Sequence, residues 1–210
     1  MLASKADSQQ TLIAFCKDRT AWQSDNEGFA WHQLLPNEEL VTMTMHAYSR
    51  DRAYLITAGK TIHYTMDKGA NWRRVTAPIE PNTFGIPLLD FHPTRPDWLI
   101  WTGNRECRET LSPNCRPVAF VSRDGGGSWS ELSDYVRTCS WARDARFKID
   151  ERNILCEVYR RDSGSDLPIM ANPIELRVSN DYYRNSKVLF NSIVGFATFE
   201  EYMVVAEVRY

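Results

Sequence analysis

The octet Thr65-Met66-Asp67-Lys68-Gly69-Ala70-Asn71-Trp72 decides the fold of this 210-residue chain, because its pattern returns along the sequence. Ser122-Arg123-Asp124-Gly125-Gly126-Gly127-Ser128-Trp129 repeats the pattern of hydroxyl residue, Asp, Gly and Trp in full. Hydroxyl and carboxylate oxygens accept backbone N–H bonds within tight loops, and Gly supplies the positive φ that closes such a loop. The pattern therefore predicts a hairpin turn followed by a returning strand, with the Trp packed beneath the loop.

Two imperfect copies extend the repeat toward both ends of the chain. The pattern positions of the first copy are Ser24, Asn26, Gly28 and Trp31. The last copy keeps Ser179 and Asp181 but departs from the pattern, with Tyr183 and Ser186 where Gly and Trp are expected. The copies start at residues 24, 65, 122 and 179, so they are 41, 57 and 57 residues apart.

Runs of β-branched and aromatic residues around each copy predict strands. The strands that lead into the octets are predicted at residues 20–23, 62–64, 118–121 and 174–178. A second family of strands precedes these, at 12–15, 54–57, 98–101, 154–158 and 202–206, and a further strand per unit is predicted at 41–46, 88–91 and 194–199. No long apolar stripe has the helical period, so we expect little helix.

Four strands per unit, repeated along the chain, are typical of the blades of a β-propeller, which run to about 40–50 residues. The longer intervals are explained by insertions between strands, around residues 102–117, 144–153 and 160–173. We therefore expect an all-β fold, a partial β-propeller of about four four-stranded antiparallel blades. The predicted blades are approximately 1–36, 37–80, 81–134 and 135–190, with the start of a further blade at 191–210. Because the chain begins and ends within units, we expect it to be part of a larger ring.

Five cysteines bear on the compartment, and none forms a CxxC pair that would indicate a zinc ribbon or a thioredoxin site. Cys107 and Cys115 bracket a loop rich in turn-forming residues, and Cys139 and Cys156 flank a polar segment between two apolar runs. Two local disulfides are therefore predicted, which indicates an oxidising compartment. The alternative is small buried thiols in a reducing cytosol. Cys16 lies at the second-strand position, as Cys156 does, so its partner is expected on a first strand outside this chain.

The repeated octet resembles the Asp-box of sialidases, some glucanases and sortilin-type receptors, and by itself it describes a scaffold rather than a function. Longer stretches are similar to the sortilin-type vacuolar sorting receptors, in particular the fungal receptors for carboxypeptidase Y. These stretches are residues 60–69, 91–103, 134–144 and 194–207. The resemblance covers roughly residues 10–210.

The resemblance implies a ten-bladed propeller in the lumenal part of a type I membrane receptor that carries soluble hydrolases from the late Golgi to the vacuole. The expected partners are a soluble vacuolar hydrolase precursor or peptide cargo and the remaining blades of the same propeller. The expected location is the lumen of the Golgi and endosomes. In the family the basic residue that anchors peptides lies on a blade beyond Tyr210, so no ligand-binding residue is assigned.

A glycan-processing or glycan-binding propeller of the sialidase type is the alternative function. Sialidases need clustered arginines and a Tyr nucleophile with an acidic partner, and glucanases need two carboxylates across a cleft. Arginines such as Arg73, Arg105 and Arg143 show no spacing that singles out a triad. Asp67 and Asp124 are already assigned to turns. We therefore expect no catalytic residue and a protein that is not an enzyme.

Composition excludes further classes of partner. A net charge of −2 and a pI near 6.1 give no electrostatic reason to expect nucleic acid or an anionic membrane. The four histidines show no metal-ligand spacing, so no metal or cofactor is expected. Trp31, Trp72 and Trp129 could stack on sugars, but their fixed place in the repeat predicts that they are core residues.

Overall fold

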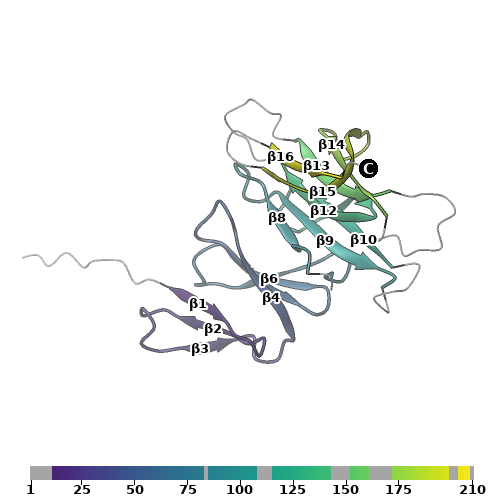
Figure 1. Ribbon diagram of the computed structural model, residues 1–210. Helices are drawn as coiled ribbons and strands as arrows, with labels where there is room; N and C mark the ends of the chain where they lie inside the picture. The colour runs from purple at the N-terminus through teal and green to yellow at the C-terminus, as the bar shows by residue number, and fades with distance from the viewer. Residues whose placement is uncertain are drawn as a thin grey trace, which may run out of the picture. The chain divides into compact units, whose positions relative to one another are not determined.

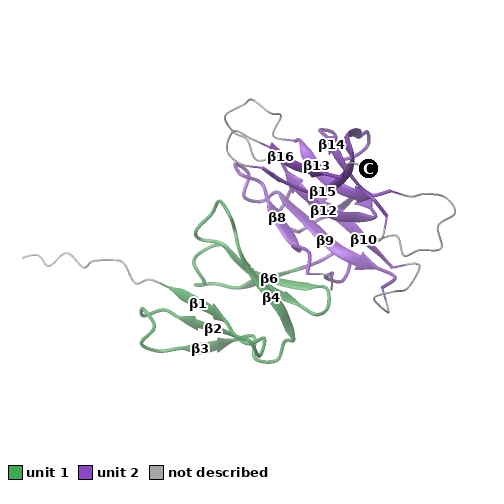
Figure 2. Cartoon of the chain, viewed as in Figure 1, with its two compact units in different colours: residues 1–75 green, residues 76–210 purple. Residues whose placement is uncertain are grey.

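The computed structural model describes residues 11–82, 85–107, 115–142, 152–160, 172–198 and 203–208 (Figure 1). The regular elements in these ranges are β-strands, which form four antiparallel sheets, so the prediction of an all-β fold is confirmed. The chain divides into two compact units, residues 1–75 and 76–210, which are described separately (Figure 2). Within the described ranges, no helix has the length and apolar character needed to cross a membrane.

The first unit contains a three-stranded and a four-stranded sheet, each a meander in which strands adjacent in sequence are paired. The three-stranded sheet consists of β1 (Leu12–Phe15), β2 (Ala21–Ser24) and β3 (His32–Leu34). The four-stranded sheet consists of β4 (Leu40–Met45), β5 (Ala53–Thr57), β6 (Thr61–Thr65) and β7 (Arg73–Thr76). The two sheets have equivalent strand registers, because the first residue of each octet pairs with the first residue of the preceding strand. Leu12 lies opposite Ser24, and Ala53 lies opposite Thr65.

The two sheets of the first unit share one hydrophobic core. Its fully buried members are Ala21, Leu34, Leu40 and Leu55. All five residues of β5 are buried. A strand covered on both faces requires a continuous apolar run rather than alternation, which explains the sequence Ala53-Tyr54-Leu55-Ile56-Thr57.

The second unit contains a four-stranded and a five-stranded sheet, in the orders β11-β10-β9-β8 and β12-β13-β14-β15-β16. The first consists of β8 (Leu89–Phe91), β9 (Leu99–Arg105), β10 (Arg116–Ser122) and β11 (Ser130–Asp134). The second consists of β12 (Val136–Trp141), β13 (Ile154–Tyr159), β14 (Ile174–Ser179), β15 (Lys187–Thr198) and β16 (Met203–Glu207).

The long strand β15 belongs to two pairings. Its first part, up to Ile193, pairs with β14, and the part from Ile193 onward pairs with β16. β15 therefore continues across residue 190, the predicted boundary between two blades. The division into blades stays a prediction. The predicted insertions at 144–153 and 160–173, and the strand ends predicted at Phe199 and Tyr202, lie wholly or mostly outside the described residues.

The sheet that begins with β12 is covered on both faces. One face packs on the preceding sheet, in a core that joins Val136 and Trp141 to Ile100 and Val121. The opposite face has its own core, centred on Leu155, Leu176 and Ile193. Phe196 of β15 and Val205 of β16 pack against this second core, so the last strands of the same sheet cover that face. Packing of the other face on the preceding sheet is what neighbouring blades of a propeller show.

Candidate functional site

The four octets form the same loop, between β2 and β3, β6 and β7, β10 and β11, and β14 and β15. In each loop the first hydroxyl accepts the backbone N–H of the residue four positions later. The N···O distances are 2.8 Å at Ser24, 2.9 Å at Thr65, 2.8 Å at Ser122 and 2.9 Å at Ser179. The same hydroxyl donates to the side-chain oxygen of the third residue, at 3.0 Å for Asn26 and 2.8 Å for Asp67, Asp124 and Asp181.

A residue with positive φ closes each loop. The angle is 93° at Gly28, 88° at Gly69 and 94° at Gly126. In the fourth loop Tyr183 takes this place with φ of 63°, and its hydroxyl donates to the carbonyl oxygen of Arg177 at 2.9 Å. Burial raises the pKa of Tyr183 above its ordinary value. Packing of this aromatic side chain offsets the backbone strain, so the fourth loop has the geometry of the others without the Gly.

The residue four positions after each Asp completes the loop. Asn71, Ser128 and Asn185 each donate a side-chain hydrogen bond to Oδ2 of the preceding Asp. Ala30 takes this place in the first loop, where Asn26 replaces the Asp. The side-chain amide nitrogen of Asn26 cannot accept a hydrogen bond in the way that Oδ2 of an Asp does. The first loop therefore lacks both the carboxylate and the side-chain donor that would bond to it.

These bonds stabilise the ionised carboxylates. The hydrogen bonds from Asn71 lower the pKa of Asp67, and those from Ser128 lower the pKa of Asp124. The backbone and side-chain bonds from Asn185 lower the pKa of Asp181 from 3.8 to about 2. The loops are therefore polar turns held by charge-assisted bonds, and these three aspartates are not suited to act as acids near neutral pH.

The prediction that the octet tryptophans are core residues is wrong for Trp31, which is exposed, whereas the ring of Trp72 packs against the buried core of the first unit. Trp31 is 43% exposed and Trp72 and Trp129 are partly buried, whereas Trp101 and Trp141 are fully buried. The three tryptophans immediately precede the returning strands β3, β7 and β11, at the ends of the sheets, where their rings cover loops. Trp72 donates its indole N–H to Oε1 of Gln23 in the neighbouring sheet, and Trp129 donates to the carbonyl oxygen of Thr76.

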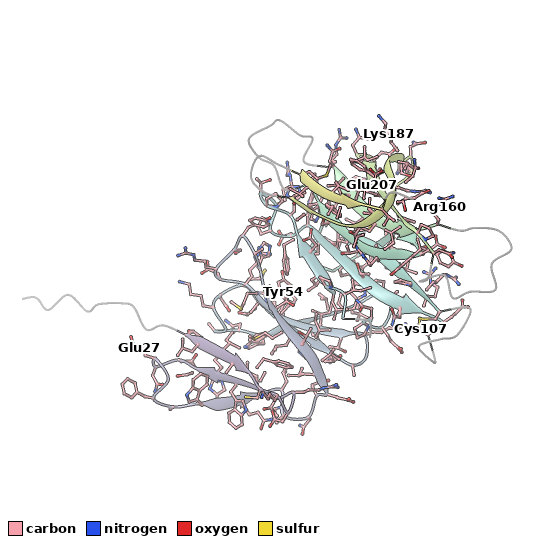
Figure 3. All side chains as sticks on the ribbon, in the orientation of Figure 1. Glu27, Tyr54, Cys107, Arg160, Lys187 and Glu207 are labelled. Atoms are coloured by element: carbon pink, nitrogen blue, oxygen red, sulfur yellow. A yellow bond between two sulfur atoms is a disulfide. The ribbon has the colours of Figure 1, made fainter. Side chains whose placement is uncertain are left out.

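Both predicted disulfides are formed. Cys107, labelled in Figure 3, is bonded to Cys115. Cys139 is bonded to Cys156, its direct partner in the register of β12 and β13. The proposed equivalence of Cys16 and Cys156 is wrong. Leu12 aligns with Ile154, because each faces the first residue of an octet, so Ala14 is equivalent to Cys156. Cys16 lies two residues further on, in the turn after β1, as a free thiol.

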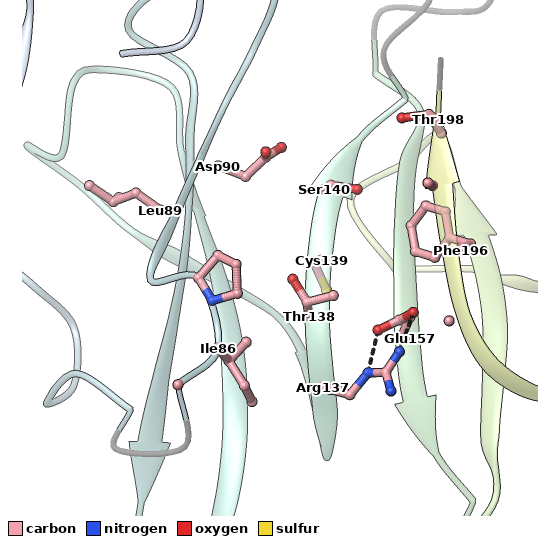
Figure 4. Close-up of a pocket in the computed structure, with 14 residues that line it drawn as sticks. Ile86, Leu89, Asp90, Arg137, Thr138, Cys139, Ser140, Glu157, Phe196 and Thr198 are labelled. Atoms are coloured by element: carbon pink, nitrogen blue, oxygen red, sulfur yellow. Dashed lines mark hydrogen bonds and ion pairs between the residues drawn. The ribbon is translucent and has the colours of Figure 1, made fainter. Parts of the chain in front are cut away.

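A cavity of about 550 Å³ lies within the second unit, where three strand edges approach one another (Figure 4). β8 and β12 are the end strands of their sheets, and β15 beyond Ile193 pairs with β16 alone. Apolar walls are formed by Ile86, Pro87, Leu89 and Phe196, and hydroxyl groups by Thr138, Ser140 and Thr198. This mixture of apolar surface and few polar groups is typical of ligand sites.

An ion pair forms one wall of the cavity. Nε and Nη2 of Arg137 donate to the two carboxylate oxygens of Glu157, each at 2.6 Å (Figure 4). The Glu157 side chain is 3% exposed and that of Arg137 is 30% exposed. The bonds to Glu157 raise the pKa of Arg137, so the guanidinium stays charged. Gly195 makes room for the pair, since a Cβ there would lie 3.2 Å from Nη2 of Arg137.

Apart from Cys139, which was predicted as a disulfide cysteine, the residues that line the cavity carry no signal in the sequence. They come from separate strands and follow no local spacing. Two of the strands that contribute to the walls were nevertheless predicted, as the further strands at 88–91 and 194–199. Among the described residues, no group of three or more His, Cys, Asp or Glu side chains could hold a metal ion. The predicted octet residues and the cavity residues form separate groups.

Similarity to solved structures concerns the fold alone. The match to an oligogalacturonate lyase in complex with manganese covers 90% of this chain and 53% of the lyase chain, with a TM-score of 0.58 and 10% sequence identity. The match to YCF48 bound to a D1 peptide covers 91% of this chain and 56% of the YCF48 chain, with a TM-score of 0.50 and 13% sequence identity.

Sequence similarity is far more specific. The family model described as Sortilin, neurotensin receptor 3, matches residues 19–209. Proteins named Vacuolar protein sorting/targeting protein 10 from Mycosarcoma maydis and Laccaria bicolor are 43% and 44% identical over 96% and 94% of this chain. The chain spans 14% and 13% of the length of these two relatives. On these grounds, and with its stacked antiparallel sheets, the chain belongs to the sortilin/Vps10 family and forms part of its β-propeller.

Proposed function

We propose that this chain is part of the lumenal, cargo-binding region of a sorting receptor, which binds soluble hydrolases in the late Golgi for delivery to the vacuole. Membership of the Vps10 family supports this proposal. The two disulfides support an oxidising lumen as the location. The sheets would serve as successive blades, divided near residues 36, 80, 134 and 190, of a ten-bladed ring that also includes segments outside this chain.

The cavity bounded by β8, β12 and β15 is the observation that carries the proposal for this chain. Its volume of about 550 Å³ lies within the range of about 300–1,000 Å³ that is usual for ligand pockets. Both apolar side chains and hydroxyl groups line it, and the charge of Arg137 is balanced by Glu157. Such a lining suits a short peptide segment better than a strongly charged ligand.

The catalytic alternative finds little support in the same region. Glu157 and Tyr159 lie on one face of β13, the residue types that a sialidase combines. However, Tyr159 is only 5% exposed and its pKa is raised by burial, and Glu157 is engaged by Arg137. A nucleophile must reach its substrate, so this arrangement argues for a binding protein rather than an enzyme.

Binding of a purified vacuolar hydrolase precursor to the receptor that carries this chain tests the proposal. We expect saturable binding that Ala197→Trp weakens at least about tenfold, because the ring would occupy the cavity. Val194→Trp is the matched control, since Val194 is also exposed on β15 but does not line the cavity. Equal binding by the two variants would show that cargo does not use the cavity. Cleavage of a fluorogenic glycoside by the wild type would favour the enzyme instead.

A further inference from the structure

Two half-buried aromatic side chains, Trp98 and Tyr182, meet beside the third and fourth octet loops. Trp98 directly precedes β9, whose first residue pairs with Ser122 at the start of the third octet, and Tyr182 belongs to the fourth. The ring centroids lie 6.4 Å apart, with the rings edge to face. Both rings pack on the buried core that contains Trp141, so packing fixes where they stand.

A guanidinium group lies over each of these rings. Cζ of Arg95 is 5.0 Å from the ring centroid of Trp98, and Cζ of Arg123 is 5.0 Å from that of Tyr182. Both distances are within the range of about 6 Å in which a cation is attracted to an aromatic face. Arg95 and Arg123 are exposed. These four side chains form an arginine–aromatic cluster.

Arg123 is the member of the cluster that is arranged to bind a ligand. In the part of the chain that the structure describes, its guanidinium lies on the ring of Tyr182 and forms no ion pair. A guanidinium carries five N–H donors in a planar fork that matches the two oxygens of a carboxylate. Stacking restricts the side chain in advance, so a ligand immobilises less side-chain freedom on binding.

The fourth loop does not require an aromatic residue at position 182. The corresponding residues of the other octets are Glu27, Lys68 and Gly125, with φ of 61°, 58° and 71°, and Tyr182 has φ of 59°. A bulky side chain is unfavourable in this left-handed conformation. The turn therefore forms without the ring, and the contact with Arg123 supplies another role for it.

The glycine amides of the third octet are not available to an anion. Gly125 N–H donates to the carbonyl oxygen of Asp97 at 2.9 Å, and Gly126 N–H donates to Oγ of Ser122 at 2.8 Å. Backbone N–H groups of turns form anion sites only where they are unpaired. Recognition of an anion at this place therefore depends on the side chain of Arg123.

The charges around the cluster favour one carboxylate on a flexible segment over an anionic membrane. Asp97, Asp124 and Asp181 each lie one or two positions in sequence from a member of the cluster, and the chain has a net charge of −2. A planar anionic surface would approach these aspartates together with the arginines, whereas one carboxylate can reach Arg123 alone. Asp124 and Asp181 are bonded inside their own loops, which leaves the fork of Arg123 to the ligand.

We propose that Arg123, supported by the ring of Tyr182, binds a carboxylate side chain in an acidic peptide segment of a protein partner, with Arg95 as a second cation nearby. Binding here goes beyond the proposed function and is independent of it, because none of the four cluster residues lines the cavity. Contacts between exposed charges are screened by salt, so the cluster suits an additional attachment beside a main binding site.

The test uses the receptor that carries this chain and rhodamine-labelled ten-residue peptides of Gly and Ser with two Glu residues at varied separation. Matched peptides carry Gln in place of Glu. By fluorescence anisotropy we expect the Glu peptides to bind at least about fivefold more tightly than the Gln peptides at about 50 mM salt, and the difference to shrink at about 200 mM. A photoreactive benzophenone group on the peptide should crosslink to residues 94–98, 122–129 or 180–186.

Three variants separate binding from folding. Arg123→Lys keeps the charge but not the planar fork, and should weaken binding of the Glu peptides at least about threefold. Tyr182→Gly gives the fourth octet the residue that the third has at Gly125, so the loop should fold, yet loss of the ring should weaken binding by a similar factor. Arg184→Ala is the matched control, because Arg184 is exposed on the same octet but lies outside the cluster, and it should change binding less than about twofold.

Unfolding midpoints establish that each variant is folded. Equal binding of the Glu and Gln peptides, equal losses in Arg123→Lys and Arg184→Ala, or crosslinks confined to other parts of the receptor would overturn the proposal. Complete competition by inorganic phosphate at the peptide concentration would mean an adventitious ion only, and tighter binding of anionic vesicles than of peptide would mean a membrane site; both results also overturn it. Failure of the Glu peptides to bind leaves the proposed function intact, because binding of the hydrolase precursor tests that function separately.

Discussion

Trp72 and Gln23 lie 49 positions apart in sequence, and the indole N–H of Trp72 donates to Oε1 of Gln23 at 3.1 Å. The amide nitrogen of the same Gln23 donates to the carbonyl oxygen of Gly69, also at 3.1 Å. Gln23 is 3% exposed. One buried amide thus joins the loop of the second octet to the neighbouring sheet, which gives the octet a role in stacking as well as in turning the chain.

Replacement of Trp72 by Phe should destabilise the protein by about 1–2 kcal/mol, because the buried Oε1 of Gln23 loses its donor. Trp31→Phe is the control, since the Trp31 N–H bonds only within its own exposed loop, and it should change stability by less than about 0.5 kcal/mol. Urea unfolding of the two variants measures the difference. If both cost the same, the contact with Gln23 does not stabilise the fold.

Gly69→Ala should be more destabilising than Gly28→Ala. Both positions have positive φ, so both variants incur about 1–2 kcal/mol of backbone strain. A Cβ at Gly69 would also lie 2.5 Å from Oε1 of Gln23, whereas the nearest atom at Gly28 is Cδ1 of Leu12 at 3.5 Å. Displacement of Gln23 should add about 1–3 kcal/mol. Denaturation midpoints compare the two, and a smaller effect at Gly69 would contradict the expectation.

The Asp-box carboxylates should make the fold sensitive to acid. The pKa of Asp181 is about 2 in the folded chain against an ordinary value of 3.8. A lowered folded pKa stabilises the fold above the unfolded value, and this contribution is lost as the pH falls from about 4 through about 2. Asp67 and Asp124 act in the same direction.

A double variant isolates this effect. Asp181→Asn together with Asn185→Ala reproduces the Asn26 and Ala30 pair of the first loop, so it should fold and should lose less stability between pH 4 and pH 2 than the wild type. Asp181→Asn alone should be less stable at pH 7, because two amide nitrogens would face each other. Unfolding midpoints of the wild type and the double variant, measured across this pH range, show whether titration of Asp181 contributes to the loss of stability in acid.

Arg137→Ala should destabilise the protein by about 3–5 kcal/mol, since it leaves the buried Glu157 carboxylate without its cation. Arg177→Ala is the matched control. Its partner Glu175 is more exposed and also lies 3.7 Å from Arg160, so the cost should stay within about 1 kcal/mol. Arg137→Lys should restore only part of the loss, because an ammonium cannot form the paired bonds. Similar values for the alanine variants would contradict a structural role for the cavity ion pair.

Much of the fold could be predicted from local patterns. The octets mark hairpins because Ser, Asp and Gly act on backbone groups within a few residues, as at Thr65, Asp67 and Gly69. Strands could be placed from β-branched and aromatic runs, and β5 and β13 stand close to their predicted positions. The pairing of Cys139 with Cys156 also followed from the pattern around a hairpin.

The sequence by itself determined what local chemistry can determine: turns, strands, their repetition and the family. Tertiary structure decided the rest, because stacking brings together residues with no spacing rule between them. It brought the indole N–H of Trp72 to Gln23 while the ring packs against the core, let Tyr183 replace a glycine through packing, and shifted Cys16 away from the position of Cys156. The cavity exists only where edges of distant strands meet, so Asp90 and Arg137 acquire their surroundings from the fold alone.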